Sequence, residues 1–229
     1  MKTFISQRET LNEYGEIVES LESKYIQYFE SFGLNTNSIS NFSNDSIELV
    51  DESTQFIILS GGGSAPKEYF INSHNDYEQS HRNQKEFQLI DKSVDLKIPM
   101  IAICRGFQVL NGYLGGKIEA LRYLVNRPIK KYHPVTLGEK NIIVNNYHND
   151  GVPVDLLAPG LNVISIDKEN YHIEAFYHEK HRWLGIMWHP EREIEDSFSR
   201  DKIDQLIKDF IQNKGVIDES YYSRSWSRD

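Results

Sequence analysis

The sequence predicts an α/β domain built on a mostly parallel sheet, with helices on both faces and some antiparallel strands. Three short apolar runs typical of buried strands, at 56–60, 100–104 and 183–188, are separated by segments whose apolar residues recur at helical spacing. Such alternation favours a parallel sheet that is covered on both faces. The chain has 229 residues and shows no internal repeat or linker, so we expect one domain over 1–219 and a tail over 220–229.

The N-terminal part predicts a strand, a helix and a second strand. Residues 3–6 form the first expected strand. A helix that ends before Gly33 is expected next, because apolar side chains recur at helical spacing at Ile17, Leu21, Tyr25, Tyr28 and Phe32. We assign its tyrosines to the core. The run 56–60 then leads into three glycines, which let backbone amides approach a ligand.

The centre of the chain predicts a strand between two helices. Apolar residues within 79–97 mark one helical face, and Pro99 precedes the strand at 100–104. A helix follows and is closed by Gly115 and Gly116. Cys104 therefore lies where a buried strand passes into a helix.

The C-terminal part predicts shorter strands and a last helix. Between 133 and 178, turn residues at 138, 149–151 and 159–160 separate short segments that are compatible with antiparallel strands. The apolar run 183–188 is stopped by His-Pro-Glu, and apolar residues within 203–211 mark the last amphipathic helix.

The composition argues against several classes of partner and cofactor. A net charge of −9 without long single-sign blocks does not suit a nucleic-acid or anionic-membrane surface. The apolar runs are far shorter than the ~20 residues of a membrane span, and the N-terminus lacks a basic segment followed by an apolar stretch. We therefore expect a cytoplasmic protein with no nucleic-acid or membrane partner. A single cysteine excludes an intramolecular disulfide, and the histidine and glycine spacings predict neither a metal site nor a nucleotide cofactor.

Cys104 is the strongest candidate for a catalytic nucleophile. A helix N-terminus favours the thiolate form of a cysteine, which is the form that attacks carbonyl carbon. Gly106 permits a sharp turn, and the next backbone amide can donate to an oxyanion, as in nucleophile elbows. The alternative is that Cys104 is a small buried apolar residue. The local sequence favours the nucleophile.

His189 and Glu191 are the candidate base and orienting carboxylate. They stand two apart in an extended segment, so their side chains point to one side. A cysteine nucleophile needs an imidazole to hold its proton and a carboxylate to fix the imidazole's tautomer. If the tripeptide His189-Pro190-Glu191 is considered without Cys104, the alternative is a turn exposed to solvent. The backbone amides of Gly62 and Arg105 would complete an oxyanion hole.

Four segments together resemble the class I glutamine amidotransferase-like family, in particular its γ-glutamyl hydrolase branch. They occur in family order and spacing at 58–63, 98–108 with 115–116, 145–148 and 185–191. The resemblance implies a flavodoxin-like fold, catalytic Cys104, His189 and Glu191, and oxyanion donors at Gly62 and Arg105. It also implies that Gln108 and His148 hold the amino-acid group of a small γ-glutamyl substrate. The expected reaction is hydrolysis of a γ-glutamyl amide through a γ-glutamyl thioester.

A basic segment at 117–131 is a candidate for binding the leaving group of the substrate. It contains five lysines and arginines, Arg127 among them, and one acidic residue. A solvated loop is one interpretation, but arginines commonly bind phosphate oxygens. Members of the resembled branch act on γ-glutamyl polyamines, γ-glutamyl aminobutyrate or γ-glutamyl nucleotide amidates, and the basic segment favours the last. The alternatives are a glutaminase subunit that delivers ammonia to a synthetase and a silent binding module. The sequence leaves the oligomeric state open.

Overall fold

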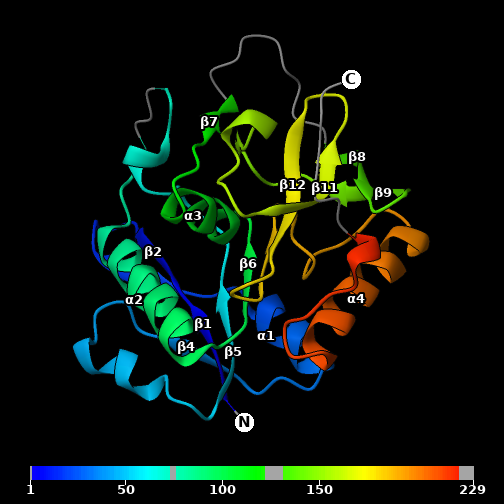
Figure 1. Cartoon of the computed structure of the whole chain (residues 1–229). Helices are drawn as coiled ribbons and strands as arrows, with labels where there is room; N and C mark the ends of the chain where they lie inside the picture. Colours follow the sequence, from blue (N-terminus) through cyan, green and yellow to red (C-terminus); the bar gives the residue numbers. More distant parts are fainter. Residues whose placement is uncertain (1, 73–75, 122–130, 222–229) are drawn as a thin grey trace.

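The computed structural model describes residues 2–72, 76–121 and 131–221, and a seven-stranded sheet forms its centre (Figure 1). The strand order is β11-β12-β13-β6-β5-β1-β4. The five neighbouring parallel strands are β1 (Lys2–Ser6), β4 (Thr36–Ile39), β5 (Thr54–Leu59), β6 (Met100–Ile103) and β13 (Trp183–Ile186). At the other side of the sheet, β12 (His172–His178) runs antiparallel to both β13 and β11 (Asn162–Asp167).

Helices cover both faces of this sheet. Helices α1 (Ser23–Ser31) and α4 (Ser197–Gln212) pack on one face, and α2 (Ser80–Leu96) and α3 (Arg105–Tyr113) pack on the other (Figure 1). The strands alternate between two cores, so Phe56 and Ile58 face α1 and α4, whereas Ile57 and Leu59 face α2 and α3. The predicted fold class is confirmed.

Smaller elements surround the sheet. Three antiparallel pairs are β2 (Arg8–Leu11) with β3 (Ile17–Ser20), β8 (Tyr132–Leu137) with β9 (Lys140–Asn145), and β7 (Glu119–Ala120) with β10 (Asp150–Gly151). Short 3-10 helices are η1 (Asn44–Leu49), η2 (Lys67–Tyr69), η4 (Val154–Leu156) and η5 (Glu219–Tyr221).

Two predicted local structures were wrong. Ile17 does not begin a helix but belongs to the β2–β3 hairpin, because Asn12 Oδ1 accepts hydrogen bonds from the backbone amides of Tyr14 and Glu16 and closes a turn there. The helix starts only at Ser23. The predicted turn at 149–151 is instead partly strand, because Asp150 and Gly151 pair with β7.

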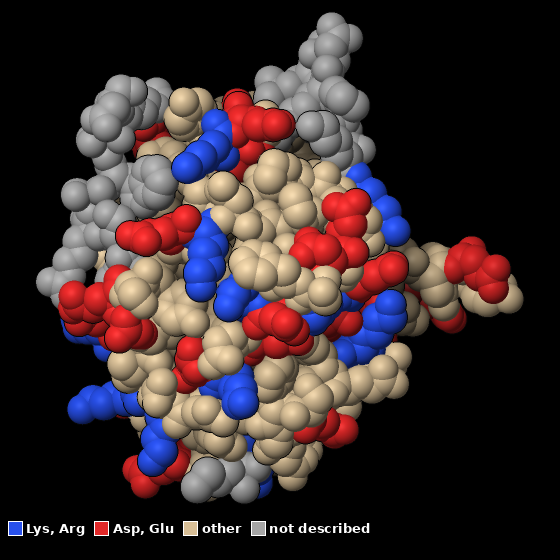
Figure 2. Space-filling view, turned by 90° about the vertical axis from the view of Figure 1, so that its right-hand side faces the viewer, with Lys and Arg blue, Asp and Glu red and all other residues tan. Residues whose placement is uncertain are grey.

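The end of the chain and the surface bear on the domain and partner predictions. Tyr221 donates a hydrogen bond from its hydroxyl to Asp209 on α4, 3.0 Å away, so the first residues of the predicted tail lie against the domain. The rest of that tail is outside the described residues. Every helix in the described ranges is too short or too polar to cross a bilayer. On the face shown in Figure 2, basic and acidic side chains are interspersed.

Candidate active site

The carboxyl ends of β5, β6 and β13 bring together the glycine loop, Cys104 and the segment around His189. Parallel sheets commonly bind ligands at this edge. A Cβ atom at Gly61 would lie 2.7 Å from Cε1 of His189 and 3.2 Å from Cβ of Cys104. The three segments therefore meet at one point, and any side chain at position 61 would clash with the imidazole of His189.

Cys104 occupies a strained turn between β6 and α3. Its φ of 52° and ψ of −103° lie outside the regions that non-glycine residues prefer, at a cost of roughly 1–3 kcal/mol. Its backbone N–H donates to the carbonyl of Ile186, 2.7 Å away, which fixes the turn against β13. A Cβ at Gly106 would lie 2.5 Å from the carbonyl oxygen of Leu59, so the helix can start this close to β5 only with glycine there. The thiol is thereby held at a helix N-terminus.

His189 and Glu191 form a short buried pair. Nδ1 of His189 lies 2.6 Å from Oε1 of Glu191, and both side chains are at most 3% exposed. Asn145 fixes the backbone of His189 from both sides, because its Oδ1 accepts from the backbone N–H at 2.9 Å and its Nδ2 donates to the carbonyl at 2.8 Å. With Nδ1 engaged by the carboxylate, Nε2 is the nitrogen left for the thiol.

The charges around His189 favour its protonated form. Burial by itself lowers the pKa of an imidazole, but the Cys104 thiolate and the Glu191 carboxylate together raise the pKa of His189 to about 9. At neutral pH this pKa favours an imidazolium, which can donate a proton, next to the candidate nucleophile Cys104.

The two predicted oxyanion donors adjoin Cys104, because Gly62 lines the same pocket and Arg105 is the next residue in the chain. Within the described residues, the backbone amides of Gly62 and Arg105 donate no hydrogen bond. Arg105 begins α3, where the first amides of a helix have no partner inside the helix. Both amides are therefore free to donate a hydrogen bond to a bound ligand.

A buried network ties both donor segments to one carboxylate. Arg82 donates to the carbonyls of Ser60 at 2.6 Å and Gly62 at 2.7 Å, and its Nε donates to Glu86 at 2.8 Å. The Arg105 side chain donates to the same carboxylate. Burial would raise the pKa of Glu86, but the charges of Arg105 and Arg82 hold it below its usual value. No local pattern in the sequence indicates that Arg82 and Glu86 lie beneath the glycine loop rather than in the pocket.

Tyr25 is a site residue that sequence reasoning missed. Its hydroxyl accepts a hydrogen bond from the backbone N–H of Gly61 at 2.9 Å and lies 3.3 Å from Nδ1 of His189. Its helical spacing predicts a core residue, and Tyr25 does pack in the core. Periodicity shows that a residue is buried, but it cannot distinguish a core tyrosine from one whose hydroxyl reaches a neighbouring site.

A pocket of about 250 Å³ opens over the thiol. Its lining includes Cys104, His189 and Gly62, together with both residues expected to hold the amino-acid group, Gln108 and His148. His148 Nδ1 lies 2.9 Å from the carbonyl oxygen of Asp150, and burial lowers the pKa of His148, which favours a neutral imidazole. The pocket thus contains five of the predicted site residues.

One group of side chains has the composition of a metal site. Among the described residues, His133, His148 and Glu174 place ligand-type atoms within 4.8 Å of one another, a donor set that a transition metal could use. They come from separate segments of the chain, so sequence spacing could not reveal the group.

Arg127 lies outside the described residues. The pocket lining does contain Arg8 and Arg192, which sequence reasoning did not single out.

One family model and several characterised proteins match the sequence of this chain. The family model for glutamine amidotransferase class-I matches residues 16–205. The γ-glutamyl-CDP-amidate hydrolase of Campylobacter jejuni is 33% identical over 112 residues, which cover 49% of this chain and 52% of that protein. A carbamoyl phosphate synthase small chain of Pyrobaculum aerophilum is 28% identical over 52% of this chain and 34% of its own length. The matches thus span about half or less of these relatives.

The fold is also found among solved structures. A candidate GMP synthase subunit from Thermoplasma acidophilum superposes with a TM-score of 0.64 at 17% identity, covering 93% of this chain and 94% of the other. A glutamine amidotransferase from Thermotoga maritima superposes with a TM-score of 0.55 at 16% identity, covering 94% and 86%. The family model covers most of the chain, and the fold agrees with it. The chain therefore belongs to the glutamine amidotransferase class-I family.

Proposed function

We propose that this protein is a cysteine hydrolase that cleaves a γ-glutamyl amide bond and releases L-glutamate together with an amine or amidate. The observation that carries the proposal is the strained turn that places Cys104 near His189, since both lie around Gly61 and Cys104 raises the pKa of His189, while His189 is itself paired with Glu191 at 2.6 Å. Nucleophile, proton carrier and orienting carboxylate are the three parts that thioester chemistry requires. Glu191 acts on the reaction through His189.

In the first half of the proposed reaction, the Cys104 thiolate attacks the γ-carbonyl carbon. The carbonyl oxygen becomes an oxyanion that accepts hydrogen bonds from the amides of Gly62 and Arg105. The tetrahedral intermediate then collapses, the carbon–nitrogen bond breaks, and the His189 imidazolium donates its proton to the departing nitrogen. The products are a γ-glutamyl thioester on Cys104, the free amine and a neutral imidazole.

In the second half, the neutral imidazole of His189 takes a proton from water as the water oxygen attacks the thioester carbon. A second oxyanion forms at the same two amides. Its collapse breaks the carbon–sulfur bond, releases L-glutamate and restores the thiolate and imidazolium pair. Gln108 and His148 would bind the amino-acid group of the glutamyl half during both steps, because both line the pocket beside the thiol.

The substrate we favour is γ-glutamyl-CDP-amidate, whose hydrolysis would yield cytidine diphosphoramidate for capsule phosphoramidate synthesis. The match to the Campylobacter jejuni protein supports this choice. A second function is supported by the carbamoyl phosphate synthase small chain. In that case, the same site would hydrolyse glutamine and pass ammonia to a synthetase partner.

An assay of the purified chain alone separates the two functions. The chain is mixed with γ-glutamyl-CDP-amidate, a γ-glutamyl polyamine and free glutamine in separate reactions, and glutamate release is followed by mass spectrometry. We expect fast glutamate release from a γ-glutamyl amide and slow release from glutamine. Fast hydrolysis of glutamine, or activity that starts only when a synthetase is added, would favour the ammonia-donating function.

A further inference from the structure

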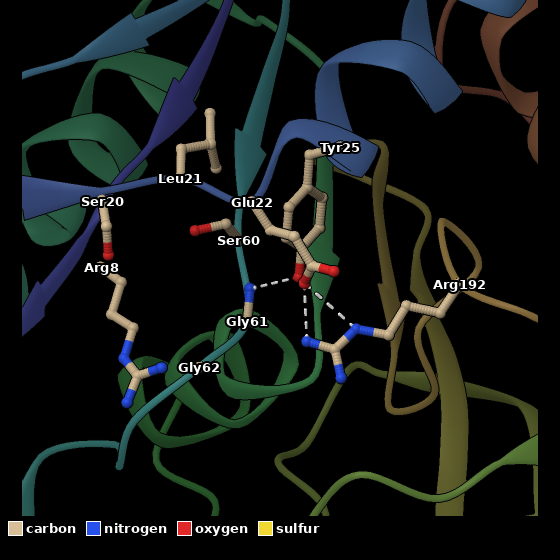
Figure 3. Close-up of a pocket in the computed structure, with 9 residues that line it drawn as sticks. All are labelled: Arg8, Ser20, Leu21, Glu22, Tyr25, Ser60, Gly61, Gly62 and Arg192. Atoms are coloured by element: carbon tan, nitrogen blue, oxygen red, sulfur yellow. Dashed lines mark hydrogen bonds and ion pairs between the residues drawn. The ribbon is translucent and has the colours of Figure 1, made fainter.

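A second pocket adjoins the one over Cys104. It has a volume of about 240 Å³ and lies beside the glycine loop, with Arg8 and Arg192 on either side of Gly61 and Gly62 (Figure 3). Arg8, Gly62 and Arg192 line both pockets. Pockets that hold drug-sized ligands measure about 300 to 1,000 Å³. Each pocket alone is smaller than that range, and because the two share lining residues a larger substrate can extend across both.

The order of the lining residues assigns one half of the substrate to each pocket. Gln108 and His148 line only the pocket over the thiol, where the glutamyl half is expected. Gly62 is one oxyanion donor and lies at the boundary, because it lines both pockets. A substrate whose carbonyl oxygen points at the Gly62 amide can therefore extend its amine half past Arg8 and Arg192 into the second pocket.

Arg8 is a cation without a partner among the described residues. It is exposed on the β2–β3 hairpin, and its guanidinium makes no hydrogen bond or ion pair with any residue that the structure describes. Its Cδ would be 3.1 Å from a Cβ at Gly62, so the side chain lies along the glycine loop. An arginine in this position can donate its fork of N–H groups to a ligand.

Arg192 is held in place by two carboxylates and a tyrosine ring. Its Nε and Nη2 donate to Glu22 at 3.2 and 2.8 Å, its Nε lies 3.7 Å from Oε1 of Glu191, and its guanidinium stacks over the ring of Tyr147 at 4.3 Å from the centroid. Among the described residues that line the second pocket, Glu22 is the one carboxylate, against two arginines. This pocket thus carries a positive charge on a protein whose net charge is −9. Such a pocket attracts an anionic amine half and repels a polyamine.

We propose that Arg8 and Arg192 form a subsite for a phosphate group on the amine half of the substrate. The proposal rests on the proposed function and makes it more specific. Of the leaving groups that the sequence leaves open, this subsite would select amines that carry a phosphate. Arg8 and Arg192 both lie outside the basic segment at 117–131. Arg8 supplies the available guanidinium, and Arg192 is a fixed second cation.

The test compares two γ-glutamyl amides that differ only in a phosphate, those of phosphoethanolamine and ethanolamine. The kcat/KM of each is measured for the native protein, for Arg8→Gln and for Lys24→Gln. Lys24 is exposed on α1 and lines neither pocket, so the control removes the same charge elsewhere on the surface. We expect the native protein to prefer the phosphorylated amide. We expect Arg8→Gln to lower the ratio of the two kcat/KM values about tenfold, the effect of one partly exposed charge-assisted hydrogen bond, and Lys24→Gln to leave it unchanged.

A binding measurement separates failure of the subsite from failure of the proposed function. The affinity of Cys104→Ala protein for the phosphorylated amide is measured by calorimetry with and without Arg8→Gln, and we expect about tenfold weaker binding in the double variant. If the native protein cleaves both amides with equal efficiency, or if Arg8→Gln affects both equally, the subsite is refuted and the hydrolase function stands. If the native protein releases glutamate neither from these two amides nor from γ-glutamyl-CDP-amidate, the hydrolase function fails. Equal affinity of the Cys104→Ala protein and the Cys104→Ala, Arg8→Gln double variant for the phosphorylated amide would then refute the subsite as well.

Discussion

The hydroxyl of Tyr25 lies 3.3 Å from Nδ1 of His189 while it accepts a hydrogen bond from the backbone N–H of Gly61 at 2.9 Å. One phenol thus connects α1, the loop after β5 and the segment after β13. Burial and the nearby charges of Glu191 and Cys104 raise the pKa of Tyr25 well above its usual value, so the phenol remains protonated. Tyr25 is therefore a positioning residue for the imidazole and for the glycine loop.

Replacing Tyr25 by phenylalanine should lower kcat about tenfold and change KM little, because the imidazole and the Gly62 segment lose a common anchor. The free energy of unfolding should fall by about 1–3 kcal/mol, since the buried N–H of Gly61 loses its acceptor. Steady-state kinetics and urea unfolding measure the two effects. Tyr14→Phe, at a side chain that is 78% exposed, is the matched control. An unchanged kcat in a destabilised Tyr25→Phe protein would show that the phenol is only structural.

The pKa of His189, raised to about 9, predicts an alkaline limit to turnover. The imidazolium donates the proton to the leaving nitrogen, so kcat/KM should fall as pH rises through about 9. Because the folded value lies above the ordinary 6.5, the stability that this group contributes is fully present below pH 6.5 and is lost as pH rises through about 9. Imidazole NMR titration should show a lower pKa for His189 in Cys104→Ala and in Glu191→Gln. An unshifted pKa in both variants would contradict the ion pair.

The three proposed catalytic side chains should differ in their effects. Cys104→Ala should lower kcat at least about a thousandfold while the protein remains folded, because the thioester cannot form. His189→Ala should be nearly as damaging, whereas Glu191→Ala should retain more activity because the carboxylate acts through the imidazole. Circular dichroism confirms folding of each variant, and kcat is measured on one γ-glutamyl amide. A larger loss for Glu191→Ala than for His189→Ala would reverse the assigned roles.

Glu86 should influence catalysis without touching substrate. Glu86→Gln leaves two buried arginines with a neutral partner, and removing one member of a buried charged network costs about 3–5 kcal/mol. We expect kcat to fall more than KM changes, because the segments that carry the Gly62 and Arg105 amides lose their common anchor. If Glu86→Gln does not fold, Arg82→Lys keeps the charge but not the forked geometry and tests the same point. A change confined to stability, with kcat unaffected, would rule out a positioning role.

The sequence predicted the buried strands and the residue types at their ends because burial and turn chemistry are local signals. The position of Cys104 followed from the apolar run before it and the glycine after it. The β2–β3 hairpin was missed because Ile17 shares helical spacing with Tyr25 by coincidence, whereas Asn12 and Gly15 close a turn in front of it. Arg8 was missed for the same reason, because it lies on this hairpin.

The polar network of the site could not be read from the sequence. Arg82, Glu86 and Arg105 belong to two helices, and their contacts depend on how α2 and α3 pack beneath the glycine loop. Tyr25 and His189 are likewise 164 positions apart in the chain, although the Tyr25 hydroxyl lies 3.3 Å from Nδ1 of His189. Local patterns identify candidates for chemistry, whereas the partners that orient them are set by tertiary packing.

The most direct test of the account is to trap the acyl-enzyme. The protein is mixed with a γ-glutamyl amide, quenched in acid within milliseconds to seconds, digested and examined by mass spectrometry, with Cys104→Ala as the control. Nucleophilic catalysis by Cys104 predicts a γ-glutamyl group on this residue that accumulates before the steady state and is absent from the control. Full turnover with no adduct on Cys104 at any quench time, even at low pH where thioester hydrolysis should slow, would contradict nucleophilic catalysis by this thiol.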